Sequence, residues 1–156
     1  MDALTYEIIE ISSIDPAVLP LISAHLTLMR ASSHPSSVHA MEPTELVDAG
    51  ALFFAVIDRG EAIAMGALKP LGDGNGELKS MHVRQDHRRS GLAKVVLLKL
   101  LDVAREGGMH RVSLETGSRD VFAPARAFYE RHGFNKCGPF ADYTDDPASA
   151  YLTLGL

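Results

Sequence analysis

The sequence predicts an α/β (α+β) fold built on a mixed, largely antiparallel sheet of six to seven strands, with about four flanking helices. Three apolar segments between residues 51 and 83 are separated by short glycine-rich turns, which is typical of an antiparallel meander. A long apolar helix then leads to a further strand, so the two strands that it joins should be parallel, with a right-handed crossover. The chain has 156 residues, 46% of them apolar, and we expect one domain spanning residues 1–156.

The first fifty residues are expected to hold one strand and two helices. Residues 5–12 (TYEIIEIS) are apolar and β-branched, which favours a strand. Asp15-Pro16 indicates a helix start, because proline is tolerated in the first turn. Apolar residues then recur at helical spacing, at Leu19, Ile22, Leu26 and Met29. The polar residues 31–41 predict a loop, and residues 43–50 predict a second short helix.

The central elements are predicted by their apolar patterns. The meander strands are expected at residues 51–58, 62–71 and 77–83, joined by the turns DRGE and GDGNG. Residues 92–106 predict a helix that is apolar over so much of its circumference that we expect it to be well buried. The alternating segment RVSLE, residues 111–115, predicts the strand that runs parallel to the third strand of the meander.

The last thirty residues are expected to complete the sheet. Residues 124–132 predict a helix with a proline in its first turn and a glycine at its end. Short strands are expected near residues 134–138 and 151–156.

Composition excludes several classes of function. The net charge of −5 argues against a general nucleic-acid-binding protein. The single cysteine, Cys137, allows no disulfide within the chain, and we expect a small buried residue there rather than a reactive thiol. The N-terminus lacks the pattern of a signal peptide, and no apolar run reaches the ~20 residues that span a bilayer. We therefore expect a cytoplasmic protein with no nucleic-acid or membrane partner and, because the histidines lack a metal-binding spacing, no metal.

The turn QDHRRSGLAK brings two arginines to the start of the long helix. Main-chain N–H groups at a helix start lack partners, and the helix dipole adds about half a positive charge there. Small side chains at Ser90, Gly91 and Ala93 let a ligand approach these groups closely. Arg88 and Arg89 are unfavourable beside the dipole without a counter-charge, so the turn predicts a site for phosphate or diphosphate.

This turn also carries a resemblance to a known family. Arg88-x-x-Gly91-x-Ala93 fits the [RQ]-x-x-G-x-[GA] signature of the GCN5-related N-acetyltransferases, the GNAT superfamily. ELKSMHV stands upstream where these enzymes have their central strand, and GMHRVSLET follows the long helix. AFYERHGF resembles the family's tyrosine-bearing helix that ends in Gly-Phe. The sequence is thus similar to this superfamily over residues 50–138.

The resemblance implies acetyl-CoA (coenzyme A) as co-substrate, bound in a cleft where the central strand splays from its neighbour. A main-chain N–H near this cleft would polarise the acetyl carbonyl. Where many members carry an asparagine that contacts the cofactor arm, this sequence has Phe122. The expected diphosphate-binding residues are Arg88, Arg89, Ser90, Gly91, Leu92, Ala93 and Lys94, and the main chain of Met81, His82 and Val83 is expected to pair with the pantetheine arm.

The resemblance also implies catalytic residues. Tyr129 falls on the tyrosine that protonates the departing thiolate in many members, a step for which a nearby phenol is suited. An amine nucleophile must lose a proton, and Glu77 stands on the central strand at the offset of a base glutamate in some members. Glu115 and His82 are rival bases.

The function implied is N-acetyl transfer from acetyl-CoA to a primary amine of a small or amino-acid-like molecule, by direct attack in a ternary complex. Acetylation of protein lysines or N-termini, and a non-catalytic acyl-CoA-binding module, are the alternatives. Ser36, Ser37 and His39 lie in the loop that usually borders the acceptor site, so they are candidate substrate-binding residues. Dimers are frequent among such proteins, and a homodimer is therefore an open expectation.

Overall fold

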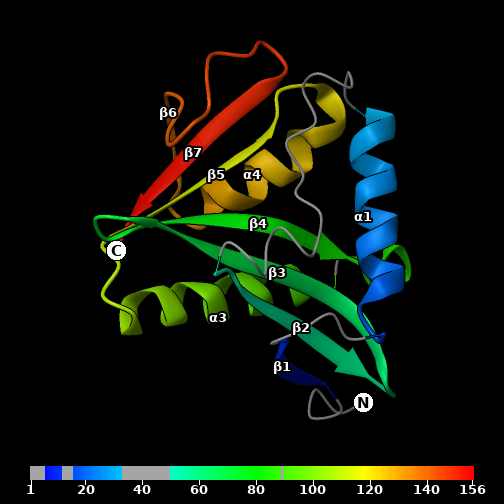
Figure 1. The fold of residues 1–156 in the computed structure, drawn as a ribbon. Coiled ribbons are helices and arrows are strands. Elements are labelled where there is room, and N and C mark those ends of the chain that lie inside the picture. Colours follow the sequence, from blue (N-terminus) through cyan, green and yellow to red (C-terminus); the bar gives the residue numbers. More distant parts are fainter. Residues whose placement is uncertain (1–5, 12–15, 33–49, 89) are drawn as a thin grey trace.

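The computed structural model describes residues 6–11, 16–32, 50–88 and 90–156. Within them, seven strands form one sheet in the order β1-β2-β3-β4-β5-β7-β6 (Figure 1). The strands are β1 (Glu7–Ile11), β2 (Leu52–Asp58), β3 (Glu61–Gly72), β4 (Asn75–Val83), β5 (Arg111–Gly117), β6 (Asn135–Cys137) and β7 (Ser149–Gly155). The helices are α1 (Leu19–Ser32), α3 (Leu92–Glu106) and α4 (Ala123–Arg131), with short 3₁₀ helices η3 (Gln85–His87) and η4 (Asp120–Phe122).

The pairing of the strands confirms the predicted mixed sheet. β2, β3 and β4 are antiparallel neighbours, which is the expected meander. β4 and β5 are parallel and are joined through α3, so the predicted crossover is also present. β7 inserts between β5 and β6 and is antiparallel to both.

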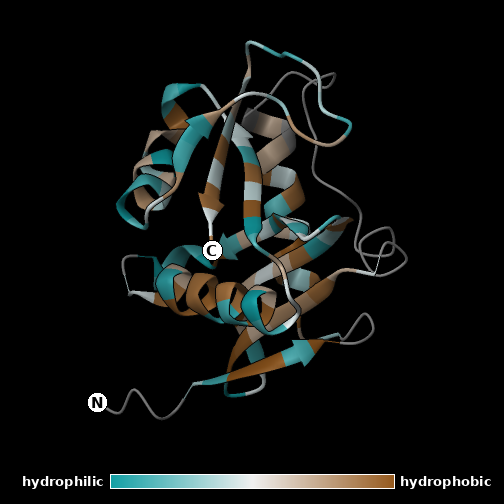
Figure 2. Ribbon diagram, turned by 90° about the vertical axis from the view of Figure 1, so that its left-hand side faces the viewer, coloured by the Kyte–Doolittle hydropathy of each residue, from teal (hydrophilic) through white to brown (hydrophobic). Residues whose placement is uncertain are grey.

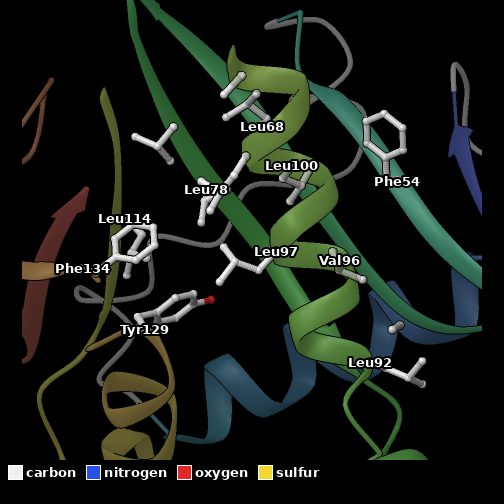
Figure 3. Close-up of a cluster of buried hydrophobic side chains, with 14 of the residues drawn as sticks. Phe54, Leu68, Leu78, Leu92, Val96, Leu97, Leu100, Leu114, Tyr129 and Phe134 are labelled. Carbon is white, nitrogen blue, oxygen red and sulfur yellow. The ribbon is translucent and has the colours of Figure 1, made fainter. Parts of the chain in front are cut away.

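The two faces of the sheet carry different helices. α3 and α4 pack on one face, where buried side chains from both helices and the central strands form the larger core; Leu97, Leu100, Tyr129 and Phe134 are among them (Figure 3). α1 packs on the other face against a smaller cluster that includes Met65 and Ala67 of β3. Helices and strands alike alternate between hydrophobic and hydrophilic stretches, as expected for elements with one face toward a core (Figure 2).

A bulge in β4 changes which side chains share a face. Met65 pairs with His82 and Ala67 with Lys79, so the one residue between them on β3, Gly66, lies opposite two residues of β4, Ser80 and Met81. Ser80 lies inside this interval and has a positive φ of 57°. The bulge therefore places His82 on the same face as Lys79, toward α1.

Two expectations about the elements need correction, and two lie outside the described residues. α3 was expected to be well buried because its apolar residues cover so much of its circumference; six of its residues are buried, but Val95 and Leu98 are 47% and 45% exposed, because only one side of the helix meets the sheet. The polar loop was expected from residue 31, whereas α1 continues to Ser32. The rest of that loop and most of the expected second helix, residues 43–50, lie outside the described part of the chain. No described helix has the length and apolar character needed to cross a membrane.

Candidate active site

A cavity of about 510 Å³ opens between the start of α3, the end of β4 and one side of α4. It joins residues that were predicted separately from three parts of the sequence. The predicted residues that line it are Met81, His82, Val83, Arg88, Gly91, Leu92, Ala93, Lys94 and Tyr129. Its volume lies in the range of small-molecule sites, which is about 300–1,000 Å³.

Other residues complete the cavity without having been predicted as site residues. They are Met65, His87, Pro124, Ala125, Phe128, Arg131 and His132. The segment AFYERHGF contains three of them, but only its tyrosine was singled out. The available signal was spacing: Arg131 and His132 follow Phe128 by three and four residues, and positions three or four apart share a helix face.

The cavity is cationic although the chain as a whole is acidic. Arg88, Lys94 and Arg131 line it, and its lining within the described residues contains no carboxylate. Gly91 adopts a left-handed φ of 84°, and a Cβ added there would meet no atom within 4 Å, so the space above the turn is open. The first intrahelical bond of α3 runs from the N–H of Val95 to the carbonyl of Gly91. The preceding N–H groups are thus free of helical partners, which suits a diphosphate.

The main chain at the end of β4 is free to pair with an extended part of the ligand. β4 pairs with β5 only from Asn75 to Leu78, opposite Arg111–Leu114. Beyond Leu78 the register with β5 stops while β4 continues to Val83, so the two strands splay as expected. The Val83 carbonyl accepts a 3.3 Å hydrogen bond from Arg88 Nε. An extended arm can pair with the open edge of β4 in the manner of an added strand.

Tyr129 reaches the cavity from α4. Its ring packs edge-on against Phe134 with a centroid distance of 5.6 Å, and its hydroxyl points toward α3 (Figure 3). Within the described residues this hydroxyl has no hydrogen-bond partner. Burial raises the pKa of Tyr129 well above its usual value, so the phenol keeps its proton and can donate it as a hydrogen bond.

Glu77 lies elsewhere, in a buried polar cluster on the opposite face of the sheet from α3. It is 3% exposed and accepts a 2.6 Å hydrogen bond from the Tyr143 hydroxyl. Lys79 Nζ lies 3.4 Å from the same carboxylate oxygen, Oε2. Glu77 is not among the residues that line the cavity, and neither is the half-buried rival base Glu115.

The third candidate base, His82, has a partner that the sequence did not indicate. His82 lines the cavity, and its Nδ1 lies 3.1 Å from Nδ1 of His25 on α1. Burial is the main cause that lowers the pKa of each ring from 6.5 to about 4, so both are neutral near pH 7.

The remaining predicted residues are placed as follows. Ser36, Ser37, His39 and Arg89 lie outside the described residues. The exposed Ser90 does not line the cavity, and its hydroxyl donates to the His87 carbonyl. Phe122 packs against Gly117 rather than the cavity. Cys137 is half-buried, and burial raises the pKa of its thiol, which disfavours the reactive thiolate.

Comparison with known proteins decides the family. The sequence model of the Acetyltransferase (GNAT) family matches residues 20–134. The chain belongs to the GNAT family of acetyltransferases. As a GNAT enzyme it uses acetyl-CoA, and the cationic helix start and the open strand edge fit the diphosphate and the extended arm of that molecule.

Individual GNAT relatives cover nearly the whole chain. YedL, an uncharacterized N-acetyltransferase of Escherichia coli (strain K12), is 40% identical over 141 residues, 90% of this chain and 89% of that protein. YsnE, an uncharacterized N-acetyltransferase of Bacillus subtilis (strain 168), is 42% identical over 139 residues, covering 89% of this chain and 92% of its own. The crystal structure of a proposed acyl-CoA N-acyltransferase from Klebsiella pneumoniae matches with a TM-score of 0.78 at 29% identity, over 97% of each chain.

Metal ligands are not clustered in the part of this GNAT chain that the structure describes. No group of three or more histidine, cysteine, aspartate or glutamate residues is arranged there to hold a metal ion.

Proposed function

We propose that this GNAT enzyme transfers the acetyl group of acetyl-CoA to a primary amine of a small or amino-acid-like acceptor, by direct attack in a ternary complex. The observation that carries the proposal is the single cavity that joins the cationic start of α3, the open edge of β4 and Tyr129. Bound acetyl-CoA supplies an activated thioester. The protein's task is then to hold the thioester in place and to manage protons on both sides of it.

The proposed binding roles follow from the lining of the cavity. The N–H groups from Arg89 to Lys94 hold the diphosphate, and the guanidinium of Arg88 adds a full charge beside them. Arg131 adds a further cation on the α4 side. The main chain of Met81, His82 and Val83 orients the arm, and an N–H of this segment polarises the acetyl carbonyl.

Proton transfer requires a donor to sulfur and an acceptor from the amine. Tyr129 is the proposed donor, because its raised pKa keeps a proton on a hydroxyl that no described residue engages. Two groups on β4 can take the proton from the amine: Glu77, directly or through water, and His82. They differ in position, since only His82 lines the cavity.

The proposed acceptor class rests on the volume of the cavity, about 510 Å³, which lies in the range of small-molecule sites. Glu77 and Lys79 pair with each other on the α1 face of the sheet, are only 3% and 8% exposed, and lie outside the lining of the cavity. Ser36, Ser37 and His39 are proposed to contact the same acceptor. We also propose that the enzyme works in the cytoplasm, possesses a single domain and forms a homodimer.

Steady-state turnover of acetyl-CoA with a panel of free amino acids, polyamines and lysine-containing peptides tests this function. The proposal predicts turnover with small amines and a loss of about 10²-fold or more in kcat for Tyr129→Phe. Tyr6→Phe is the matched control, because Tyr6 lies before β1 and does not line the cavity.

Turnover of peptides alone would favour a protein acetyltransferase, and coenzyme A binding without turnover of any acceptor would favour an acyl-CoA-binding module. Unchanged kcat in Tyr129→Phe would remove Tyr129 from the reaction.

A further inference from the structure

Two histidines that are far apart in the sequence meet beside the proposed active site. His25 comes from the inner side of α1 and is 8% exposed, and His82 comes from the end of β4 just after the bulge. Their Nδ1 atoms are 3.1 Å apart, and the rings meet edge to face at 78° with centroids 5.1 Å apart. His82 also lines the cavity that holds Tyr129. The pair therefore connects the cavity to the packed interface between α1 and the sheet.

The contact couples the tautomers of the two rings, so the tautomer of one determines the tautomer of the other. A neutral imidazole carries one N–H, so a hydrogen bond between two Nδ1 atoms needs one ring protonated at Nδ1 and the other protonated at Nε2. If His82 donates from Nδ1, its Nε2 keeps a lone pair. Nε2 of His82 has no hydrogen-bond partner within the described residues, so in this tautomer a basic nitrogen is available on the ring that lines the cavity.

The rival base on the same strand is differently placed. The Glu77 carboxylate already accepts from the Tyr143 hydroxyl at 2.6 Å and lies 3.4 Å from Lys79 Nζ. Both partners engage the same carboxylate oxygen, Oε2. Glu77 does not line the cavity, whereas His82 does.

We propose that His82 is the general base of the acetyl transfer, accepting the amine proton at Nε2, and that His25 is a positioning residue that holds His82 in the required tautomer. This inference rests on the proposed function. As the acceptor nitrogen bonds to the acetyl carbon, His82 Nε2 takes one proton from that nitrogen. The carbon–sulfur bond breaks, and Tyr129 supplies a proton to the sulfur. Exchange with solvent then removes the proton from His82 and restores the proton of Tyr129, so protons and charge balance over one cycle.

The neutral Nδ1 of His25 has a specific part in this step. Once His82 carries two protons, its Nδ1–H donates to the lone pair of His25, which stabilises the imidazolium. Among the described residues, the charged side chains that lower the pKa of the pair are Arg88, which acts on His82, and Lys79, which acts on His25. Together with burial, which is the larger cause, they keep both rings unprotonated near pH 7, and a bound diphosphate would offset Arg88 and raise the pKa of His82.

Nitrogen-15 NMR of histidine-labelled protein tests the tautomers without any turnover. The proposal predicts that near pH 7 His82 is protonated at Nδ1 and bare at Nε2, while His25 is protonated at Nε2. His25→Leu should release His82 to a mixture of tautomers, whereas His25→Asn, which keeps an acceptor near the same position, should preserve the Nδ1–H form. A His82 ring protonated at Nε2 in the wild-type protein would overturn the proposal.

Kinetics with an acceptor found in the amine panel tests the catalytic role. His82→Gln should lower kcat by about 10²-fold or more, with coenzyme A affinity, measured by calorimetry, within about twofold of wild type. His25→Leu should lower kcat with little change in KM for the amine, and His25→Asn should restore most of it. His110→Gln is the control, because His110 is exposed and does not line the cavity.

If the wild-type enzyme turns over an amine and His82→Gln keeps the same kcat, the inference fails and the proposed function stands. If wild type turns over no amine, the proposed function fails, and the base role fails with it.

Discussion

The Tyr143 hydroxyl donates a 2.6 Å hydrogen bond to the carboxylate of Glu77, which is 3% exposed at the centre of the sheet. Glu77 stands between Lys69 of β3 and Ser113 of β5 in the strand register. A buried carboxylate is costly unless hydrogen bonds satisfy it. The loop that carries Tyr143 is therefore tied to the strand that forms the active site.

Removing this donor should destabilise the protein. Tyr143→Phe leaves the aromatic ring in place but takes one hydrogen bond from the buried carboxylate, so we expect a loss of about 1–3 kcal/mol in the free energy of unfolding. Urea denaturation measures it, with Tyr6→Phe as the control. A stability equal to that of wild type would mean that water or another group satisfies Glu77 equally well.

The histidine pair should make stability depend on pH. The pKa of His25 and His82 is about 4 in the folded protein and 6.5 for the free side chain, so between these values the unfolded chain binds more protons. Their contribution is complete above pH 6.5 and falls as the pH drops toward 4, by roughly 3 kcal/mol at most for each ring. Urea denaturation across this range should show a shallower fall for His25→Leu than for wild type. An equal slope in the variant would show that His25 does not titrate as described.

The charge of Arg88 should control the basicity of His82. Burial is the larger cause of the lowered pKa of His82, and the neighbouring guanidinium is the second. Arg88→Gln removes the second cause, so the pKa of His82 should rise, and NMR titration of the ring measures it. Lys94→Gln, a charge change in the same cavity that is not among the causes acting on His82, is the comparison. A pKa that is the same in Arg88→Gln and wild type would contradict the electrostatic coupling.

Close packing between β3 and α3 should make Gly66 intolerant of a side chain. A Cβ added there would lie 2.7 Å from Val96 Cγ1 and 2.9 Å from Leu100 Cδ1, and it would also meet Met81. We expect Gly66→Ala to cost about 1–3 kcal/mol of stability through overpacking. Gly138→Ala is a suitable control, because a Cβ there would meet nothing within 4 Å. Equal thermal stability of the two variants would show that the core accommodates the added methyl group at residue 66 without a loss of stability.

Local sequence patterns predicted most of the helices and strands and about half of the residues that line the cavity. The alternating and helical apolar patterns predicted the seven strands and all three described helices, and the glycine-rich turns predicted the meander. Arg88, Gly91 and Tyr129 were identified from short motifs, and the structure brings them to one cavity. Each of these signals lies within a few adjacent residues, so no tertiary information was needed.

The missed contacts depend on features that local patterns do not contain. His25 and His82 are 57 residues apart, and Tyr143 and Glu77 are 66 apart. Strict alternation along β4 would also place His82 on the face opposite Glu77 and Lys79. The bulge at Ser80 reverses that phase, and nothing in the segment ELKSMHV marks where the extra residue falls.

Calorimetric titration with coenzyme A tests most directly the central claim that the start of α3 holds a diphosphate. The account predicts saturable one-site binding by the wild-type protein. It also predicts affinity at least tenfold weaker for Arg88→Gln and for Gly91→Val, which places a β-branched side chain at a φ of 84°. Absence of binding by the wild-type protein, or equal affinity in all three proteins, would contradict it.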